Sequence, residues 1–233
     1  RTIQVTREGA AETVIPTVVT ATTSEDSSVN AEAANGEAGF LFTSFDGVPF
    51  DGTASGVQEF ITSGSSGGQF KFFEFGSIQF AANGQFEDLG VGQTRVTTVN
   101  YTMEDTGGTE YSGRIDVTVP GLTDDPTAAN ETEATTENAS ASFNVLSGAA
   151  DIDGDTLKVI SVYTDATQSI ADGGYLVARG WAGGEFTVNS DGNVTFDPGT
   201  QFDKLKEAET LTTTHGYTVG DGKGGEINRT KEK

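Results

Sequence analysis

The chain contains no cysteine, so disulfides and cysteine-based zinc or redox sites are excluded. It also has little positive charge: 13 basic residues stand against 35 acidic ones, and the formal net charge is -22. A surface this acidic repels phosphate backbones and anionic lipids, so nucleic acids and membrane surfaces are poor partners, whereas cations are attracted. No apolar run approaches the roughly 20 residues of a membrane-spanning helix, and we expect no membrane insertion.

Histidine is nearly absent as well, which argues against an enzyme. His215 is the only histidine, and without cysteine the chain has little material for an acyl-transfer triad. The segment 64–68 matches the pattern G-x-S-x-G, but no helix is predicted after it to complete a nucleophile elbow. We expect a non-enzymatic protein, with no catalytic residues, in which His215 is a solvent-facing strand residue.

Short alternations of apolar and polar residues, separated by turn residues, run through the chain. Residues 114–119 alternate as a strand with one buried face, and hairpins are predicted over residues 186–196 and 78–86, around Asp-Gly and Asn-Gly pairs. The only helix candidate, residues 203–208, is equally compatible with a polar loop. Many short strands with regular turns predict an all-β fold of the sandwich type, with Greek-key strands.

An internal repeat of about 110 residues divides the chain. Residues 100–108 resemble residues 216–224, and residues 81–86 resemble residues 189–194. This spacing is the size of one β-sandwich. We therefore predict two tandem Ig-like β-sandwich domains, residues 13–122 and 123–233.

The first residues of the chain resemble the closing strand of the first repeat. Residues 2–9 match residues 114–121, whereas the corresponding end of the second repeat, residues 226–233, is short and highly charged. We therefore predict that residues 1–12 form a strand that belongs to a neighbouring domain, with Ile3 and Val5 as its assembly residues. Two explanations stay open: an excerpt of a long tandem array, or a subunit that donates this strand head-to-tail and polymerises into a filament.

The sharpest chemical motif is the loop Asp151-Ile152-Asp153-Gly154-Asp155. Three carboxylates at alternate positions can converge on one cation, and Ca²⁺ accepts six to eight oxygen ligands in irregular geometry. The loop is no EF-hand, because its glycine is at the fourth position and Val162 stands where the bidentate glutamate belongs. The turns at Asp221 and Asp105 and the linker acid Asp124 are weaker candidates for the same chemistry.

Several segments resemble the bacterial cadherin-like and VCBS-type repeats of large extracellular adhesins. The linker 121–126, the acidic loop 151–157 and the closing turn 217–225 match the motifs of that family. The resemblance implies an extracellular, cell-surface β-sandwich protein of adhesion or biofilm type, stiffened by Ca²⁺, whose partners are neighbouring repeats or identical subunits. The metal ligands that it implies are Asp124, Glu137, Asp151, Asp153, Asp155 and Asp221 in the second unit and Glu25 and Asp105 in the first.

A carbohydrate-binding module is the rival interpretation, with surface glycans as partners. It requires exposed aromatic side chains on a sheet or loop. Trp181 and Tyr175 flank a glycine-containing stretch, and residues 70–75 hold four phenylalanines. Large aromatic residues more often pack in cores, so we expect most of these side chains to be buried.

Overall fold

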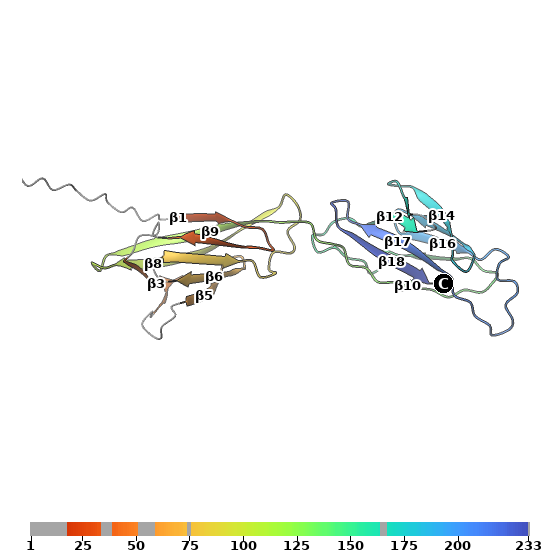
Figure 1. Ribbon diagram of the computed structural model, residues 1–233, viewed down its shortest axis with the longest axis horizontal. Helices are drawn as coiled ribbons and strands as arrows, with labels where there is room; N and C mark the ends of the chain where they lie inside the picture. Colours follow the sequence, from red (N-terminus) through yellow and green to blue (C-terminus); the bar gives the residue numbers. More distant parts are fainter. Residues whose placement is uncertain (1–17, 34–38, 51–58, 74–75, 164–166, 233) are drawn as a thin grey trace, which may run out of the picture. The chain divides into compact units, whose positions relative to one another are not determined.

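The structure is a computed structural model that describes residues 18–33, 39–50, 59–73, 76–163 and 167–232 (Figure 1). It divides into two compact units, one of Arg1–Phe86 with Thr94–Pro120 and one of Glu87–Gln93 with Gly121–Lys233. The described residues form strands and loops and contain no α-helix, so the predicted all-β class is confirmed. None of them forms a helix long and apolar enough to span a bilayer.

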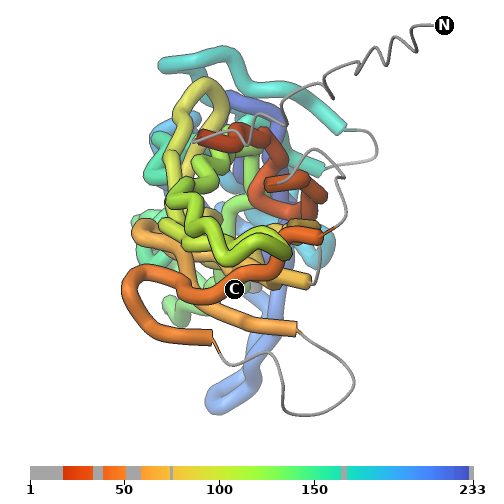
Figure 2. Tube along the Cα trace, turned by 90° about the vertical axis from the view of Figure 1, so that its left-hand side faces the viewer, coloured from red at the N-terminus to blue at the C-terminus, as the bar shows by residue number. Residues whose placement is uncertain are grey.

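The first unit is a sandwich of two sheets. One sheet has the order β1-β9-β8-β3-β4 and the other the order β2-β7-β6-β5. β1 runs parallel to β9, beside which it lies in Figure 2, and the other pairs are antiparallel. The strands are β1 (Val18–Thr22), β2 (Ser28–Glu32), β3 (Phe40–Phe45), β4 (Val48–Pro49), β5 (Glu59–Ser63), β6 (Gln69–Phe73), β7 (Ser77–Ala81), β8 (Thr94–Asp105) and β9 (Glu110–Pro120).

The second unit repeats this topology strand for strand. Its sheets have the orders β10-β18-β17-β12-β13 and β11-β16-β15-β14, and β10 runs parallel to β18 as β1 does to β9. The internal repeat seen in the sequence is therefore a repeat of the fold. The strands are β10 (Glu131–Thr132), β11 (Ala141–Asn144), β12 (Lys158–Tyr163), β13 (Thr167–Ser169), β14 (Tyr175–Arg179), β15 (Glu185–Asn189), β16 (Asn193–Asp197), β17 (Thr214–Gly220) and β18 (Glu226–Glu232).

Apolar and polar residues alternate along the strands, and the apolar residues on the inner faces form the core of each unit. In β9, Ile115, Val117 and Val119 point inward and are at most 1% exposed, while the residues between them are at least partly exposed. The same period places Phe70 and Phe72 of β6 in the core of the first unit, as predicted for part of the phenylalanine run. Burial of such large aromatic side chains is the main source of stability for a sandwich without disulfides.

Matching hydrogen bonds show which residues of the two units correspond. For much of their length, a residue of the second unit has a number 116 higher than its counterpart in the first. Thr97 Oγ1 donates to the carbonyl of Gly67 at 2.8 Å, and Thr213 Oγ1 donates to the carbonyl of Gly183 at 2.9 Å. Both threonines lie against a glycine, Gly64 or Gly180, where a Cβ would collide with the threonine hydroxyl. The same offset pairs Phe86 with Phe202 and Leu89 with Leu205.

The structure confirms one of the two predicted hairpins and corrects several other predictions about single elements and residues. The hairpin over residues 186–196 is confirmed as β15 and β16, but the one over 78–86 is wrong, because Phe86 is a buried loop residue and β7 pairs with β6 and β2. Residues 203–208 form turns, not a helix. His215 is 1% exposed, so its predicted solvent exposure is wrong: β17 has neighbours on both sides in its sheet, and all but its first residue are buried.

The end of the second unit also differs from the expectation. Residues 226–232, which looked too short and charged to close the sandwich, form β18 and pair with β17 over seven residues. Charged residues are compatible with this strand because its solvent-facing side chains need no apolar character. The predicted donor strand, residues 1–12 with Ile3 and Val5, lies outside the described residues.

Candidate metal centre

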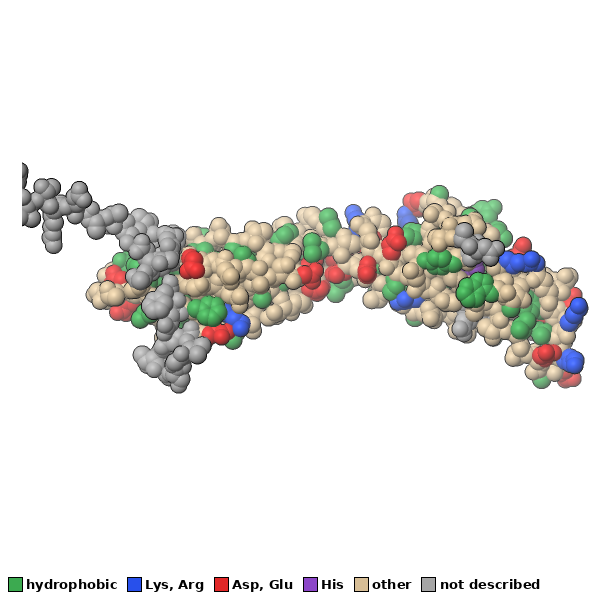
Figure 3. Space-filling model, in the orientation of Figure 1, with side chains coloured by type: hydrophobic (Ala, Val, Ile, Leu, Met, Phe, Trp, Pro, Cys, Tyr) green, Lys and Arg blue, Asp and Glu red, His purple; other side chains and the backbone are tan. Residues whose placement is uncertain are grey.

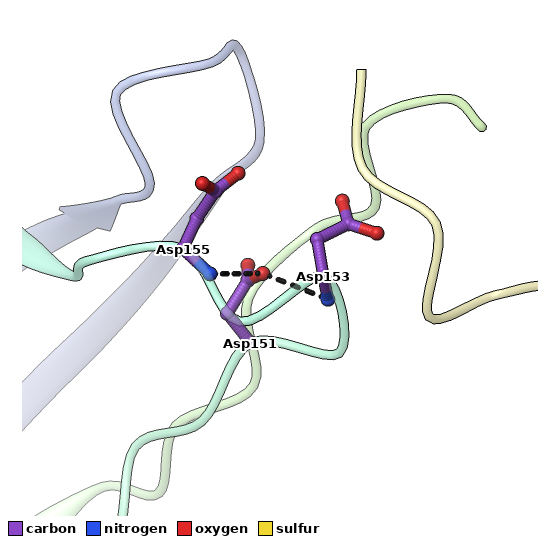
Figure 4. Close-up of side chains that lie close together, drawn as sticks. All are labelled: Asp151, Asp153 and Asp155. Carbon is purple, nitrogen blue, oxygen red and sulfur yellow. Dashed lines mark hydrogen bonds between the residues drawn. The ribbon is translucent and has the colours of Figure 1, made fainter. Parts of the chain in front are cut away.

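The loop between β11 and β12 brings the three predicted carboxylates together. Asp151, Asp153 and Asp155 each place a carboxylate oxygen within 4.8 Å of the others, and all three residues are half-buried. Asp151 Oδ1 organises the loop by accepting the backbone N–H groups of Asp153 at 3.0 Å and Asp155 at 3.2 Å (Figure 4). Gly154, at a φ of 78°, turns the chain between them.

Two oxygens of this loop are buried without a hydrogen-bond partner. They are Asp151 Oδ2 and Asp153 Oδ1. A buried carboxylate oxygen normally accepts hydrogen bonds, because leaving it unpaired costs about 1–3 kcal/mol or more. Together with the mutual repulsion of three nearby carboxylates, this arrangement fits a site for a hard cation.

The acidic residues near the start of the second unit's main segment are bound to this loop. The backbone N–H of Asp124 donates to Asp153 Oδ2 at 3.1 Å, and the carboxylate of Asp125 accepts the backbone N–H of Glu226 at 3.2 Å. Asp124 is thus brought to the Asp151 loop through its main chain. Residues Asp124–Asp125 are held between that loop and the start of β18.

A segment of the second unit that contains two acidic residues also passes beside this loop. Glu87 and Asp88 lie in the segment Glu87–Gln93, which belongs to the second unit by its contacts. The segment passes beside the loop, since a Cβ at Gly90 would lie 3.4 Å from Asp153 Cβ.

The carboxylate of Asp221 is used to hold its own turn. The residue is 4% exposed, and its Oδ1 accepts the backbone N–H groups of Lys223, Gly224 and Gly225 at 2.6 to 3.1 Å. Asp105 does the same in the first unit, accepting from Gly107 and Thr109. The hydrogen bond from Thr109 is the largest cause that holds the pKa of Asp105 below its ordinary value. Both residues therefore act in turns, and neither belongs to the Asp151 cluster.

The remaining predicted ligands lie elsewhere. Glu137 is half-buried, accepts a hydrogen bond from Asn138 at 3.3 Å, and lines a cavity with Phe196 and Lys206. Glu25 belongs to the first unit and is 2% exposed. Of the eight predicted metal ligands, the structure therefore gathers Asp151, Asp153 and Asp155 through their side chains and Asp124 through its main chain.

Two aromatic residues of the second unit are less buried than expected. Trp181 is 74% exposed and Tyr175 is 64% exposed, so the expectation of core packing is wrong for both. Tyr175 begins β14, the last strand of its sheet among the described residues, and Trp181 follows that strand. Figure 3 shows hydrophobic side chains on the surface of the second unit.

Comparison with known proteins identifies a family model that matches most of the second unit. Residues 123–231 match the model of the bacterial cadherin-like domain. No curated protein sequence matches the chain. Among solved structures, the crystal structure of protocadherin gamma C5 EC1-3 aligns with a TM-score of 0.42 at 12% identity, over 93% of this chain and 65% of that one.

Two further solved structures match at similar levels. The crystal structure of mouse protocadherin-24 EC1-3 gives a TM-score of 0.39 at 17% identity, over 94% of this chain and 69% of that one. The I-band fragment I67-I69 from titin gives 0.33 at 10% identity, over 94% and 62%. Residues 123–231, which carry the acidic loop, the closing turn and the strand order described above, form a bacterial cadherin-like domain.

Proposed function

We propose that the chain is a non-enzymatic segment of an extracellular adhesion protein in which Ca²⁺ bound at the Asp151 loop stiffens the linker 121–126. The observation that carries the proposal is the pair of buried, partnerless carboxylate oxygens of Asp151 and Asp153 in a cluster of three acids. The cadherin-like family of residues 123–231 supports the extracellular, adhesive setting, within a surface adhesin or a biofilm matrix.

The choice of calcium follows from the ligands. The loop offers carboxylate oxygens, which are hard ligands, and the described acidic cluster contains no histidine that would favour zinc or copper. Mg²⁺ demands near-ideal octahedral geometry and keeps its waters, whereas Ca²⁺ tolerates an irregular loop. Because Asp124 donates its N–H to Asp153, an ion that orders Asp153 also orders the linker.

Calcium is expected to raise the melting temperature of the second unit. At a free concentration of 100 times Kd, a ligand that binds only the folded state adds about 2.7 kcal/mol to the free energy of unfolding. For a domain of this size that corresponds to roughly 10 °C. Calorimetry of the chain in calcium, in magnesium and in a chelator measures the effect. Equal melting temperatures in all three solutions would remove calcium from the proposed function.

Glycan binding is a second candidate, favoured by large aromatic residues that, among the described residues, are mostly exposed only in the second unit. At the 116-residue offset, Trp181 and Tyr175 correspond to Ser65 and Glu59 in the first unit. Large exposed aromatic rings are typical of binding surfaces, whereas the repeat shows that the fold itself does not need them. The partner would be a surface glycan whose rings stack on these side chains.

Trp181→Ala is expected to abolish glycan binding while changing the free energy of unfolding by less than about 0.5 kcal/mol, because the side chain is mostly exposed. A glycan array followed by NMR titration measures binding. Ile61→Ala is the matched control, since Ile61 is 50% exposed at the position of β5 that corresponds to Val177 of β14. Retention of binding in the Trp181 variant would exclude this surface.

A further inference from the structure

The outer strand β14 of the second unit is the longest of the four outer strands in that unit. It is the last described strand of its sheet, and its only partner among the described strands is β15 (Figure 1). β14 has five residues, whereas the outer strands β10, β13 and β11 have two, three and four. Short outer strands discourage pairing with other molecules, so β14 is the outer strand on which this protection is weakest.

The backbone of β14 directs hydrogen-bonding groups to its outer side. In antiparallel pairing, alternate residues direct both their N–H and their C=O to the same neighbour. The N–H of Gly180, just after β14, donates to the carbonyl of Gly184 at 3.0 Å, so the even-numbered residues face β15. The odd-numbered residues face away from β15, as the N–H of Trp181 does when it donates to the carbonyl of Thr214 at 3.2 Å.

The odd-numbered residues of β14 also carry the exposed side chains of the strand. Tyr175, Val177 and Arg179 are exposed, with 52% of Val177 accessible to solvent. Leu176 and Ala178, between them, are at least half-buried. A strand that presents large side chains together with outward-directed backbone groups is a template for pairing with another chain.

The corresponding strand of the first unit, β5, carries a charge that β14 lacks. Glu59 stands at the position of Tyr175 and forms an ion pair with Lys71 of β6 at 2.7 Å. A carboxylate on an outer strand opposes pairing, because pairing would remove its water. Residues 173–184 contain no acidic residue, and Arg179 is their only charged one. An acidic residue at this position is therefore compatible with the fold, but the second unit does without it.

We propose that β14 pairs antiparallel with β14 of a second copy of this chain, about a two-fold axis at Val177. In this register Val177 lies opposite Val177 of the second copy, and Tyr175 lies opposite Arg179. All three residues direct their N–H and C=O groups outward, so each pair exchanges both of its hydrogen bonds. The pairing joins two sheets at their edges and depends neither on the Asp151 loop nor on the ring of Trp181.

The backbone excludes the neighbouring registers. A shift by one residue would place outward-directed groups opposite inward-directed ones. A shift by two residues in one direction would bring in Gly173, whose φ of 71° is incompatible with an extended strand. In the other direction it would bring in Trp181, whose N–H is already bonded to Thr214. The axis at Val177 is thus the register that uses the whole strand.

The side chains of this register also fit one another. The ring of Tyr175 and the guanidinium of Arg179 from the second copy lie directly opposite each other on one face of the joined sheet, where they can form a cation–π contact. The two-fold axis makes this contact twice. Val177 meets its own copy on the axis, so no like charges are placed together there. This self-complementarity is what a symmetric interface between identical chains requires, and it identifies a second copy as the occupant.

The dimer is expected to be weak and to tighten with salt. One strand of five residues buries less area than a standard interface, so we expect a dissociation constant above about 1 μM. Each copy has a formal net charge of -22, and added salt screens the long-range repulsion between the two copies.

Cysteine crosslinking of the full chain tests the register, because the chain has no cysteine of its own. Val177→Cys is expected to give disulfide-linked dimers under mild oxidation, since opposing Cα atoms lie about 5.5 Å apart in such a pair. Tyr175→Cys alone should not, because its two copies would be roughly 14 Å apart, but it should crosslink when mixed with Arg179→Cys. Ile61→Cys, 50% exposed at the corresponding position of β5, is the control for random collision.

Sedimentation velocity over a series of concentrations measures the dimer without a crosslink. Val177→Lys places two like charges on the axis and is expected to weaken the dimer at least about tenfold. Ile61→Lys adds the same charge at a position of matched exposure and should leave the dissociation constant within about twofold of the parent.

Amide hydrogen exchange distinguishes pairing at the edge from other contacts between copies. The amides of Tyr175, Val177 and Arg179 are expected to gain protection as the concentration rises, whereas those of Leu176 and Ala178, which already face β15, should not change. A dimer without this alternation, crosslinking of Tyr175→Cys alone as readily as of Val177→Cys, or a chain that stays monomeric at every concentration and salt would overturn the proposal.

Discussion

Replacing Asp151 with asparagine is expected to remove most of the calcium-dependent stability of the second unit while leaving its calcium-free stability intact. Asparagine keeps an Oδ1 that accepts the N–H groups of Asp153 and Asp155, so the loop can hold its shape. What it loses is the charge carried by the buried, partnerless Oδ2. We expect calcium to bind at least about tenfold more weakly, a loss of about 1.4 kcal/mol.

The stability of the Asp151→Asn variant, measured with and without calcium, distinguishes a residue that binds the metal from one that only shapes the loop. Without calcium the variant is expected to be at least as stable as the parent, because three like charges within 4.8 Å become two. Isothermal calorimetry and melting in chelator and in calcium measure both effects. Asp191→Asn is the control, since Asp191 also holds its turn by accepting the N–H of Asn193, at 3.0 Å. A variant that is destabilised equally in both solutions would show that Asp151 only shapes the loop.

The acidic loop could be predicted from sequence because its chemistry is local. Three carboxylates at alternate positions around a glycine lie close together in almost any turn, and the structure gathers them. Asp221 shows where such reasoning fails, because its carboxylate accepts backbone hydrogen bonds within its own turn, residues 221–225. Spacing alone cannot tell a carboxylate that faces an ion from one that faces its own backbone.

The fold could be predicted from the repeat and the strand alternation, but the exposure of single residues could not. Trp181 and Tyr175 looked like core residues because large aromatics usually are. Their positions in the first unit hold the polar residues Ser65, which is exposed, and Glu59, which is half-buried. The correspondence between the two units, residue by residue, therefore carries information about exposure that residue type alone does not.

The same alignment explains His215. Its position corresponds to Val99, which is 0% exposed in the core of the first unit. Three threonines before it and a glycine after it made the segment look polar, yet all but the first residue of β17 are buried. Local composition predicts an exposed residue here, whereas the burial of His215 depends on the position of β17 between β12 and β18.

His215→Val is expected to make the second unit less sensitive to acid. Both ring nitrogens of His215 are buried without a hydrogen-bond partner, and the ring stacks on Phe186 at a centroid distance of 5.6 Å. Burial lowers the pKa of His215 below its ordinary value, because the charged ring is desolvated. The folded state therefore keeps the ring neutral at pH values where the unfolded chain already binds a proton.

The sign of the effect follows from this difference in proton binding. As the pH falls below the ordinary histidine pKa of about 6.5, the unfolded state gains protons first, so the folded state loses stability. The loss reaches at most about 1.4 kcal/mol per pH unit and stops once the pH passes the folded-state pKa. Above pH 7 the histidine contributes no such dependence.

Denaturant unfolding between pH 8 and pH 5, a range that spans the ordinary histidine pKa of about 6.5, measures this contribution as the difference between parent and variant. The first unit has a buried valine, Val99, at the corresponding position, so we expect the fold to tolerate a valine at position 215. Carboxylates titrate in both proteins and cancel in the difference. Parallel pH profiles for the two proteins would mean that the ring finds a proton acceptor in the folded state, and the burial argument would then be wrong.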